Sequence, residues 1–345
     1  MLKTLTELSG VSGNEKNVAD YIYSQLVPYA DSATKDTMGN LIFYKKGKNP
    51  TGKKVAVFAH MDEVGFIVTD ITDDGYIKFS AVGGIDDRIL LAQRVFVGKA
   101  SVCGVIGIKA VHLQSKDERG KVIKIDEMYI DIGTATKEEA QKVVAKGDYI
   151  TFDSHYQTLS GDKFKAKAID DRAGCAIIMD LVKEAYDSDI YFCFTVQEET
   201  GLRGAQVLSR RINPDIALVL EATTASDTAF SPKHLYATTL GKGPVITNMD
   251  RGAYSDKELN SFITQIANDN SIPYQNKLTS NGGNDSRQIQ TGASGCKVSS
   301  ISLPCRYIHS PVSVANINDY NAMKKLVLKV LENIHKFKNE KEVAK

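Results

Sequence analysis

The fold is set by one short stretch of this sequence, Lys54-Val55-Ala56-Val57-Phe58-Ala59-His60-Met61-Asp62. Its apolar part is too short for a helix of ordinary length and has the composition of a strand buried on both faces of a parallel sheet. Polar residues begin abruptly at His60. The stretch therefore predicts a buried strand that ends in imidazole and carboxylate side chains, and the same arrangement recurs farther along the chain.

Strands and helices alternate from about Ser160 onwards. Further buried strands are predicted at Asp189–Val196, Asp215–Leu220 and Val298–Leu303. Apolar spacing predicts helices at Arg172–Tyr186, Gly204–Arg211, Ser255–Asn268 (with Ser255 as cap) and Asn316–Phe337. The first 30 residues predict two more helices, the second capped by Asn14. This alternation indicates a mostly parallel central sheet flanked by helices, an α/β fold.

Residues 65–158 have a different pattern of apolar and turn-forming residues. Short β-rich runs separated by Gly and Asp turns are predicted at Gly65–Thr69, Tyr76–Ser80, Arg94–Val97, Val102–Ile108 and Tyr149–Phe152, with one short helix in Thr136–Lys146. We therefore predict a discontinuous α/β domain made of residues 1–64 and 159–345. A small β-rich domain, residues 65–158, is inserted into it.

Composition excludes several classes of protein. The 345 residues carry 43 Lys and Arg against 42 Asp and Glu, a net charge of +1, so no electrostatic attraction to nucleic acid or to an anionic membrane is expected. No apolar run has the length of a signal peptide or a membrane span. The five cysteines are irregularly spaced, which disfavours disulfides and a cysteine zinc site. We expect a cytoplasmic protein.

Acidic and imidazole side chains recur at the downstream ends of the predicted strands. They are His60 and Asp62 after the first strand, Glu198 and Glu199 after the second, Glu221 after the third, and His309 after the fourth. Asp170-Asp171-Arg172 precedes a helix, where Arg172 could simply neutralise the two aspartates. Because the carboxyl ends of parallel strands meet at one edge of a sheet, we expect these groups to lie together.

A cluster of this kind favours divalent metal ions. Carboxylates packed together repel one another, and cations remove that repulsion. Imidazole with carboxylate suits zinc, cobalt or manganese better than calcium. Two neighbouring ions need a bridging ligand, which an aspartate can supply, and a further carboxylate can act as general base. Each motif alone is unspecific, since a Glu-Glu pair is usually a solvated face and an Asp-Asp pair a turn. Only the combination is informative.

Four segments, in order and spanning nearly the whole chain, resemble the signature blocks of one family. They are Ala59–Phe66, Lys165–Gly174, Val196–Ala205 and Pro304–Pro311. The sequence is similar to the M42 family of TET-type, or tetrahedral, metallo-aminopeptidases. These include glutamyl aminopeptidase-like proteins and have sometimes been labelled endoglucanases.

The resemblance implies a role for each residue of the cluster. Asp170 would bridge two metal ions, zinc or cobalt with manganese also suitable. His60 and His309 would each bind one ion, with Glu199 and Glu221 as acidic ligands, each opposite one histidine. Glu198 would be the general base for a bridging metal-bound hydroxide, and Asp62 would orient His60. Many relatives carry Asp at the position of Glu221, so metal preference can differ there.

The resemblance also implies partners. Short peptides would be the substrates, and the inserted domain would mediate dimerisation, with dimers building a hollow tetrahedral dodecamer. The alternative is an insertion that only shapes the cleft. The Gly- and Asn-rich stretch 279–286, which contains Asp285, could form the rim of the substrate pocket or a plain surface turn. If Arg251 points into that pocket it would favour an acidic first residue, and otherwise a neutral or broad preference is expected.

Three other functions compete with the aminopeptidase. A two-metal deacylase or carboxypeptidase-like amidohydrolase would keep the site and change the substrate. A glycoside hydrolase would use Glu198 or Glu199 with another carboxylate, but it would leave His60 and His309 without a role, and the chain has no Trp to stack on sugars. A non-catalytic scaffold would have no use for Glu198.

Overall fold

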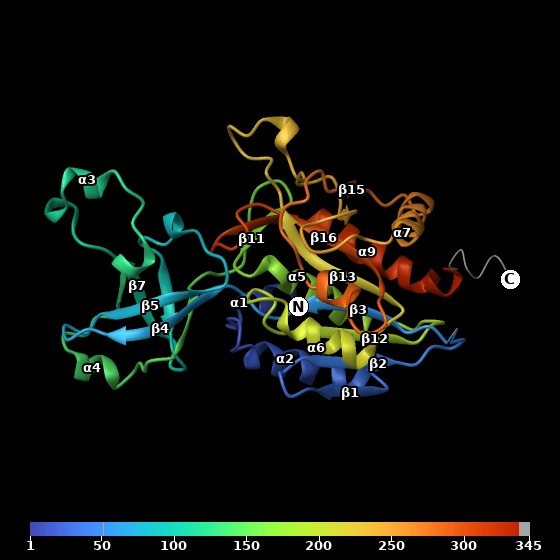
Figure 1. Cartoon of the computed structure of the whole chain (residues 1–345), viewed down its shortest axis with the longest axis horizontal. Coiled ribbons are helices and arrows are strands. Elements are labelled where there is room, and N and C mark those ends of the chain that lie inside the picture. Colours follow the sequence, from blue (N-terminus) through green and yellow to red (C-terminus); the bar gives the residue numbers. More distant parts are fainter. Residues whose placement is uncertain (51, 338–345) are drawn as a thin grey trace.

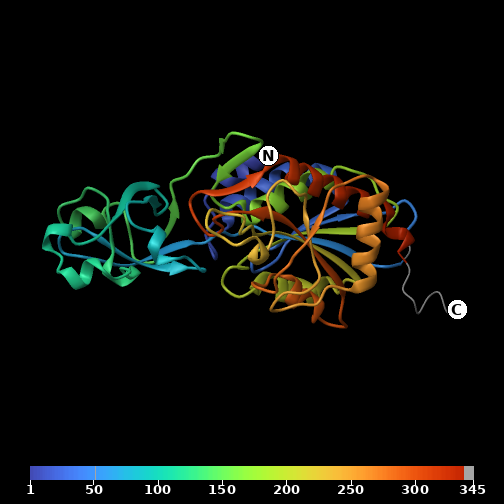
Figure 2. The ribbon, with the colours of Figure 1, turned by 90° about the horizontal axis from the view of Figure 1, so that it is seen from above.

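The structure is a computed structural model that describes residues 1–50 and 52–337. It consists of a large α/β domain and a small β-barrel that stands to one side of it (Figures 1 and 2). The barrel is formed between Gly65 and Phe152, so the chain leaves the α/β domain and returns to it. Residues 338–345, the end of the predicted α/β segment, lie outside the described residues.

The α/β domain is built on a mixed sheet of eight strands. In spatial order these are β1 (Ser32–Lys35), β2 (Leu41–Lys45), β12 (Ile190–Thr195), β3 (Val55–His60), β13 (Ile216–Thr224), β16 (Lys297–Cys305), β14 (Val245–Thr247) and β15 (Gln275–Asn276). The four central strands, from β12 to β16, run parallel. Antiparallel pairing is confined to the outer strands β1, β2 and β14. The predicted mostly parallel sheet is confirmed.

Helices cover both faces of this sheet. They are α1 (Leu2–Glu7), α2 (Lys16–Leu26), α5 (Ile169–Leu181), α6 (Arg203–Ile212), α7 (Lys257–Asp269), α8 (Ser286–Gln290) and α9 (Ile317–Asn333). Strand β3 shows how the sequence produces two layers. Val55, Val57 and Ala59 pack into the core under α1, α2, α5, α7 and α9, whereas Ala56 and Phe58 pack under α6 and α8. Alternate side chains of a strand face opposite sides, so an uninterrupted apolar run fills both cores.

The inserted barrel closes around a core of its own. Its strands follow one another in space as β4 (Gly65–Ile71), β5 (Ile77–Val82), β8 (Tyr129–Asp131), β7 (Val102–Gly107), β6 (Arg94–Val97) and β9 (Tyr149–Phe152). The short helices α3 (Lys116–Arg119) and α4 (Lys137–Gln141) lie in its connections. Sequence patterns did not predict β8, which has only three residues and carries too little alternation to signal a strand.

A small antiparallel sheet joins the return from the barrel to the chain before α9. It contains β10 (Gln157–Thr158), β11 (Lys163–Ala166) and β17 (Ser313–Asn316). The remaining elements are the 3-10 helices η1 (Val27–Tyr29), η2 (Asp87–Ile89), η3 (Val111–Leu113), η4 (Ile125–Glu127), η5 (Lys233–Leu235) and η6 (Ile334–Lys336). Because β11 leads into α5 and β17 follows the loop after β16, this sheet brings two remote segments together near Asp170.

Several predicted boundaries differ from the structure: α5 and α9, for example, end at Leu181 and Asn333 rather than at Tyr186 and Phe337. Helix α2 begins after Glu15 rather than Asn14. Helix α7 is capped by Asp256 instead of Ser255, since the Asp256 carboxylate accepts the Leu259 N–H at 2.9 Å. Strand β13 continues to Thr224, which places Glu221 inside the strand. In the described part of the chain, no helix combines the length and apolar character that a membrane span requires.

Candidate metal centre

The central strands deliver the predicted side chains to one edge of the sheet. His60 is the last residue of β3, and Glu221 lies on the neighbouring strand β13. Glu198 and Glu199 follow β12, and His309 follows β16. These positions arise because parallel strands end at a common edge.

Asp170, at the start of α5, lies between the two histidines. Its Oδ1 is 3.3 Å from His60 Nε2, and its Oδ2 is 3.4 Å from His309 Nε2. Each histidine also faces one glutamate. Glu221 Oε2 is 3.6 Å from His60 Nε2, and Glu199 Oε1 is 3.2 Å from His309 Nε2. The arrangement is therefore two half-sites that share one aspartate.

Ligand atoms in three overlapping groups lie within 4.8 Å of one another: His60, Asp170 and Glu221; Asp170, Glu199 and His309; and His60, Glu198 and Glu199. Glu221 Oε1 is buried and has no hydrogen-bond partner among the described residues. Two imidazoles and several carboxylates, with an unpartnered oxygen in their midst, are a donor set that suits zinc, cobalt or manganese. The residues present fit a pair of divalent cations.

Burial makes the ionised form of these carboxylates less favourable and so raises their pKa values. It raises the pKa of Glu221 to about 8, with repulsion from Asp170 and Asp285 adding to the rise and His60 opposing it. Burial also raises the pKa of Glu198 well above its usual range, and Glu221 and Asp285 add to the effect. Burial would lower the pKa of His309, but contacts with Asp170 and Glu199 outweigh it and raise this pKa to about 11. In the metal-free protein, protonated histidines therefore offset part of the negative charge.

Asp170 responds in the opposite direction. Burial alone would raise the pKa of this carboxyl, yet hydrogen bonds with His309 and His60 hold it below its usual range. An ionised carboxylate with both oxygens directed at histidines is well suited to contact two cations at once.

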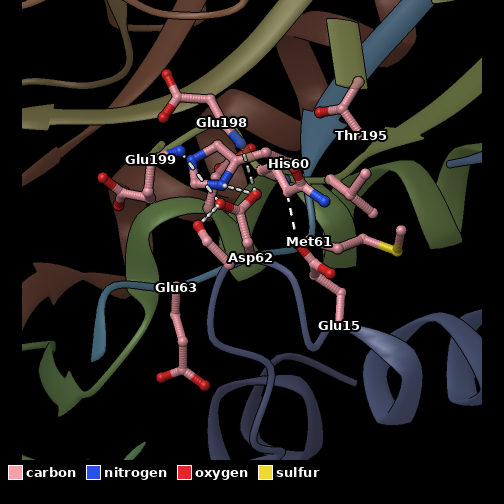
Figure 3. Close-up of polar contacts among 12 residues, drawn as sticks. Glu15, His60, Met61, Asp62, Glu63, Thr195, Glu198 and Glu199 are labelled. Carbon is pink, nitrogen blue, oxygen red and sulfur yellow. Dashed lines mark hydrogen bonds and ion pairs between the residues drawn. The ribbon is translucent and has the colours of Figure 1, made fainter. Parts of the chain in front are cut away.

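Asp62 contacts both His60 and the backbone of the adjacent glutamates Glu198 and Glu199 (Figure 3). Its Oδ1 lies 3.4 Å from His60 Nδ1 and accepts the Glu198 N–H at 3.0 Å. Its Oδ2 accepts the Glu199 N–H at 3.1 Å and the hydroxyl of Ser12. One fully buried carboxylate thus holds an imidazole in orientation and fixes the backbone of the adjacent glutamates.

His309 is oriented by the inserted domain. Its Nδ1 lies 2.8 Å from the carbonyl oxygen of Gly84, which follows β5 of the barrel. A hydrogen bond from Nδ1 to this carbonyl leaves Nε2 free to face Asp170 and Glu199. Nothing in the sequence pointed to Gly84, because a backbone carbonyl acts without regard to residue type.

Arg172 does not neutralise Asp170 and Asp171. Its fully buried guanidinium donates to the carbonyls of Met61 at 2.7 Å and Leu5 at 2.6 Å and reaches Glu63 at 3.3 Å. Asp171 instead accepts the N–H of Gly174 at 2.9 Å within α5. The alternative in which Arg172 neutralises the adjacent aspartates does not hold, since its guanidinium joins the N-terminal segment to the end of β3.

A cavity of about 470 Å³ opens beside the cluster. Glu198, Asp250 and Lys277 line it, together with Thr279 and residues 281–284 of the Gly- and Asn-rich stretch. Glu198 makes none of the salt bridges seen among the described residues, whereas Glu199 pairs with His309. Burial lowers the pKa of Lys277, and Asp250 and Glu221 oppose this effect. Lys277 and His309 are thus the basic side chains in the lining, and Lys277 is the one that lies outside the cluster.

The two residues expected at the substrate pocket occupy other places. Arg251 is exposed, and it is absent from the lining of the cavity. Asp285 is 1% exposed and lies beneath the cluster, where it accepts the hydroxyl of Thr195 at 2.6 Å. Its pKa is raised to about 6, chiefly by burial.

Comparison with known proteins shows the family. The sequence pattern described as M42 glutamyl aminopeptidase matches residues 39–326. The chain belongs to this family. A curated chain of Acetivibrio thermocellus, provisionally named an aminopeptidase, is 41% identical over 333 residues and covers 96% of this chain and 97% of its own length. A lysyl aminopeptidase of Pyrococcus furiosus is 33% identical over 343 residues, which are 97% of this chain and 96% of that one. The predicted family and enzyme class, a metallo-aminopeptidase, are confirmed.

Solved structures agree with the fold. An aminopeptidase of Desulfurococcus kamchatkensis superimposes with a TM-score of 0.93 at 34% identity, covering 98% of this chain and 96% of that one. The TET1 peptidase of Pyrococcus horikoshii, described as assembling into a tetrahedron or a large octahedral shell, gives 0.85 at 33% identity over 96% and 98%. A Thermotoga maritima protein described as an endoglucanase gives 0.81 at 37% identity over 97% of each chain. The α/β domain with an inserted barrel is therefore the fold of TET peptidases.

Proposed function

We propose that this M42 protein removes N-terminal residues from short peptides at a centre of two divalent metal ions. The observation that carries the proposal is Asp170, whose two carboxylate oxygens face two different histidines at 3.3 and 3.4 Å. His60 and Glu221 would hold one ion, His309 and Glu199 the other, and Asp170 both. Zinc or cobalt suits this set best, and manganese is also compatible.

The metal pair, when bound, polarises the peptide carbonyl and makes water more acidic. Glu198 then takes the proton from the attacking water and passes it to the leaving amine. Its position supports this role, because it lines the cavity beside the cluster while Glu199 is engaged with His309. Asp62 keeps His60 in the orientation that leaves Nε2 available to the cluster.

The alternatives account for fewer features. A glycosidase needs two carboxylates but no histidine, so it would leave the paired imidazoles of His60 and His309 unexplained. We therefore do not extend to this chain the description of the Thermotoga maritima relative as an endoglucanase. A deacylase would use the same metal centre without recognising a free α-amino group, so only substrate choice separates it from an aminopeptidase.

The direct test uses matched substrates. The protein is stripped with a chelator and assayed on aminoacyl-p-nitroanilides and their N-acetylated counterparts, with and without added cobalt, zinc or manganese. We expect metal to restore cleavage of the free-amine substrates only. Equal cleavage of the acetylated substrates would move the protein to the deacylase or endopeptidase class, and metal-independent cleavage would refute the two-metal mechanism.

We further propose that the protein assembles through its barrel, in dimers that build a dodecamer. The barrel region exposes large apolar side chains, among them Val111 and Leu113 at 62% and 61% and Val122 at 49%. Exposed apolar residues gathered on a small domain are typical of an interface. Light scattering tests this proposal, because Leu113→Asp should reduce the assembly, and an unchanged mass would remove the barrel from the interface.

A further inference from the structure

The turn that follows β12 is held by an unusual set of hydrogen bonds. Four successive backbone N–H groups, those of residues 196–199, each donate to a side-chain oxygen from elsewhere in the chain. The acceptors are Asn40 Oδ1 at 3.0 Å, Glu15 Oε1 at 3.1 Å, Asp62 Oδ1 at 3.0 Å and Asp62 Oδ2 at 3.1 Å. Carbonyls of the same turn accept N–H groups of residues 201–204. The backbone that carries Glu198 is thus fixed on both sides.

Gln197 is the strained residue next to Glu198 in this turn. Its φ is +57°, a left-handed conformation that residues with a side chain rarely adopt. Such a conformation persists only when the surrounding contacts hold it. The N–H of Gln197 donates to Glu15, and Gln197 directly precedes Glu198. Glu15 therefore holds the Val196–Gln197 peptide, on the N-terminal side of the residue that precedes Glu198, while Asp62 accepts the N–H of Glu198 itself.

Glu15 is itself rigidly placed. Its side chain is buried, and the same Oε1 accepts the Gly13 N–H at 2.7 Å. The segment before it is fastened to the end of β3, since the Ser12 N–H donates to the Glu63 carbonyl at 3.2 Å and its hydroxyl donates to Asp62. Figure 3 shows Glu15 on the far side of Asp62 from the Glu198 carboxylate. Glu15 is therefore a fixed support that touches none of the proposed metal ligands' side chains among the contacts described.

We propose that Glu15 is a positioning residue for Glu198, which it aligns by holding Gln197 in its left-handed conformation. The proposal rests on the proposed function of Glu198 as general base. Without the Glu15 carboxylate, a nearly buried N–H loses its acceptor and the turn relaxes. A displacement of Glu198 by about 1 Å is enough to slow the reaction on the order of 100-fold. The metal ligands keep their own contacts, so metal binding persists.

The test compares three variants with the wild-type protein. Glu15→Ala removes the acceptor, and Glu15→Gln keeps an oxygen that can accept both N–H groups. Glu15→Ala combined with Gln197→Gly relieves the left-handed strain, because glycine adopts positive φ freely. We expect Glu15→Ala to lower kcat about 10- to 100-fold with KM and metal content little changed. Glu15→Gln should retain most of kcat, and the double variant should recover part of the loss.

Amide hydrogen exchange supplies a readout that does not depend on activity. We expect the N–H groups of Gln197 and Glu198 to exchange at least about tenfold faster in Glu15→Ala, with those of β3 unchanged. Glu7, which accepts the N–H of Tyr156 instead, provides the matched control through Glu7→Ala. Unchanged exchange at Gln197 would overturn the proposal even if the protein cleaved no peptide. Faster exchange with unaltered kcat would also overturn it, as would a loss of kcat that Glu15→Gln shares in full. Wild-type protein without activity on free-amine substrates, but with the exchange difference present, would refute the proposed function alone.

Discussion

Replacing Glu221 by glutamine should stabilise the metal-free protein at high pH and destabilise the metal-loaded protein. The reason lies in burial, which raises the pKa of the Glu221 carboxyl from 4.5 to about 8. Between these two values the unfolded chain has lost its proton while the folded chain keeps it. The metal-free protein therefore loses stability as the pH rises from about 4.5, and the full loss is present above about pH 8. Glutamine, which cannot ionise, escapes this loss.

The size of the effect follows from the two pKa values. Their difference, 8 − 4.5 = 3.5, corresponds to about 5 kcal/mol at about 1.4 kcal/mol for each pKa unit. This value is an upper limit, since the charges of neighbouring groups, among them Asp170 and His60, contribute to the shift and respond to the same change in pH. We expect Glu221→Gln to gain at least about 1.4 kcal/mol at pH 9 and almost nothing at pH 4.5.

Urea unfolding in excess chelator, followed by circular dichroism between pH 4.5 and 9, measures this gain. Exposed Glu184 provides the control, because Glu184→Gln should leave the pH profile unchanged. Adding zinc or cobalt should reverse the order, since the wild-type protein gains binding free energy that the variant has partly lost. A metal-free Glu221→Gln protein no more stable than wild type at pH 9, or equally favoured at pH 4.5, would refute the reasoning.

Three further perturbations follow from the same geometry. Glu198→Gln should lower kcat on the order of 10²- to 10⁴-fold while metal analysis still finds two ions per subunit, and a loss of metal would instead make Glu198 a ligand. Arg172→Leu should lower the free energy of unfolding by about 3–5 kcal/mol, because it leaves the buried carbonyls of Met61 and Leu5 without this donor and leaves buried Glu63 with Lys167 as its remaining cation. Arg88→Leu at the exposed barrel should change it by less than about 1 kcal/mol. Lys277→Met should reduce the ratio of kcat/KM for glutamyl over leucyl substrates, while Arg251→Met should not, and the opposite pattern would return the pocket cation to Arg251.

The part of the site that strand ends supply could be predicted from the sequence. A buried apolar run predicts a parallel strand, and parallel strands end at one edge of their sheet. His60, Glu199 and Glu221 were therefore expected to lie close together. Strand β13 continues past Glu221, but this error in the predicted boundary does not change where the Glu221 side chain lies along the strand.

Other parts depend on contacts that no local pattern records. Asp170 lies at the start of a helix, and only the resemblance to a family motif distinguished it from Asp171 as the bridging residue. Glu15 resembled an ordinary residue of a helix start, yet its partner Gln197 lies 182 positions away. Whether Arg251 or Lys277 lines the cavity depends on which of the two loops folds toward the cluster. The composition of the loops does not determine this.

The position of the barrel within the chain has a consequence for how the protein is made. His60 leaves the ribosome before the barrel, Asp170 follows it, and His309 comes near the end of the chain. At roughly 5–20 residues per second, about 12–50 s separate the first histidine from the last. The barrel, with its own core, can fold completely in that interval, and the Gly84 carbonyl then awaits the arrival of His309. A nascent chain in the cell thus offers metal ions only part of the ligand set until synthesis is almost finished. Both metal sites can therefore be filled only in chains that have been synthesised past His309.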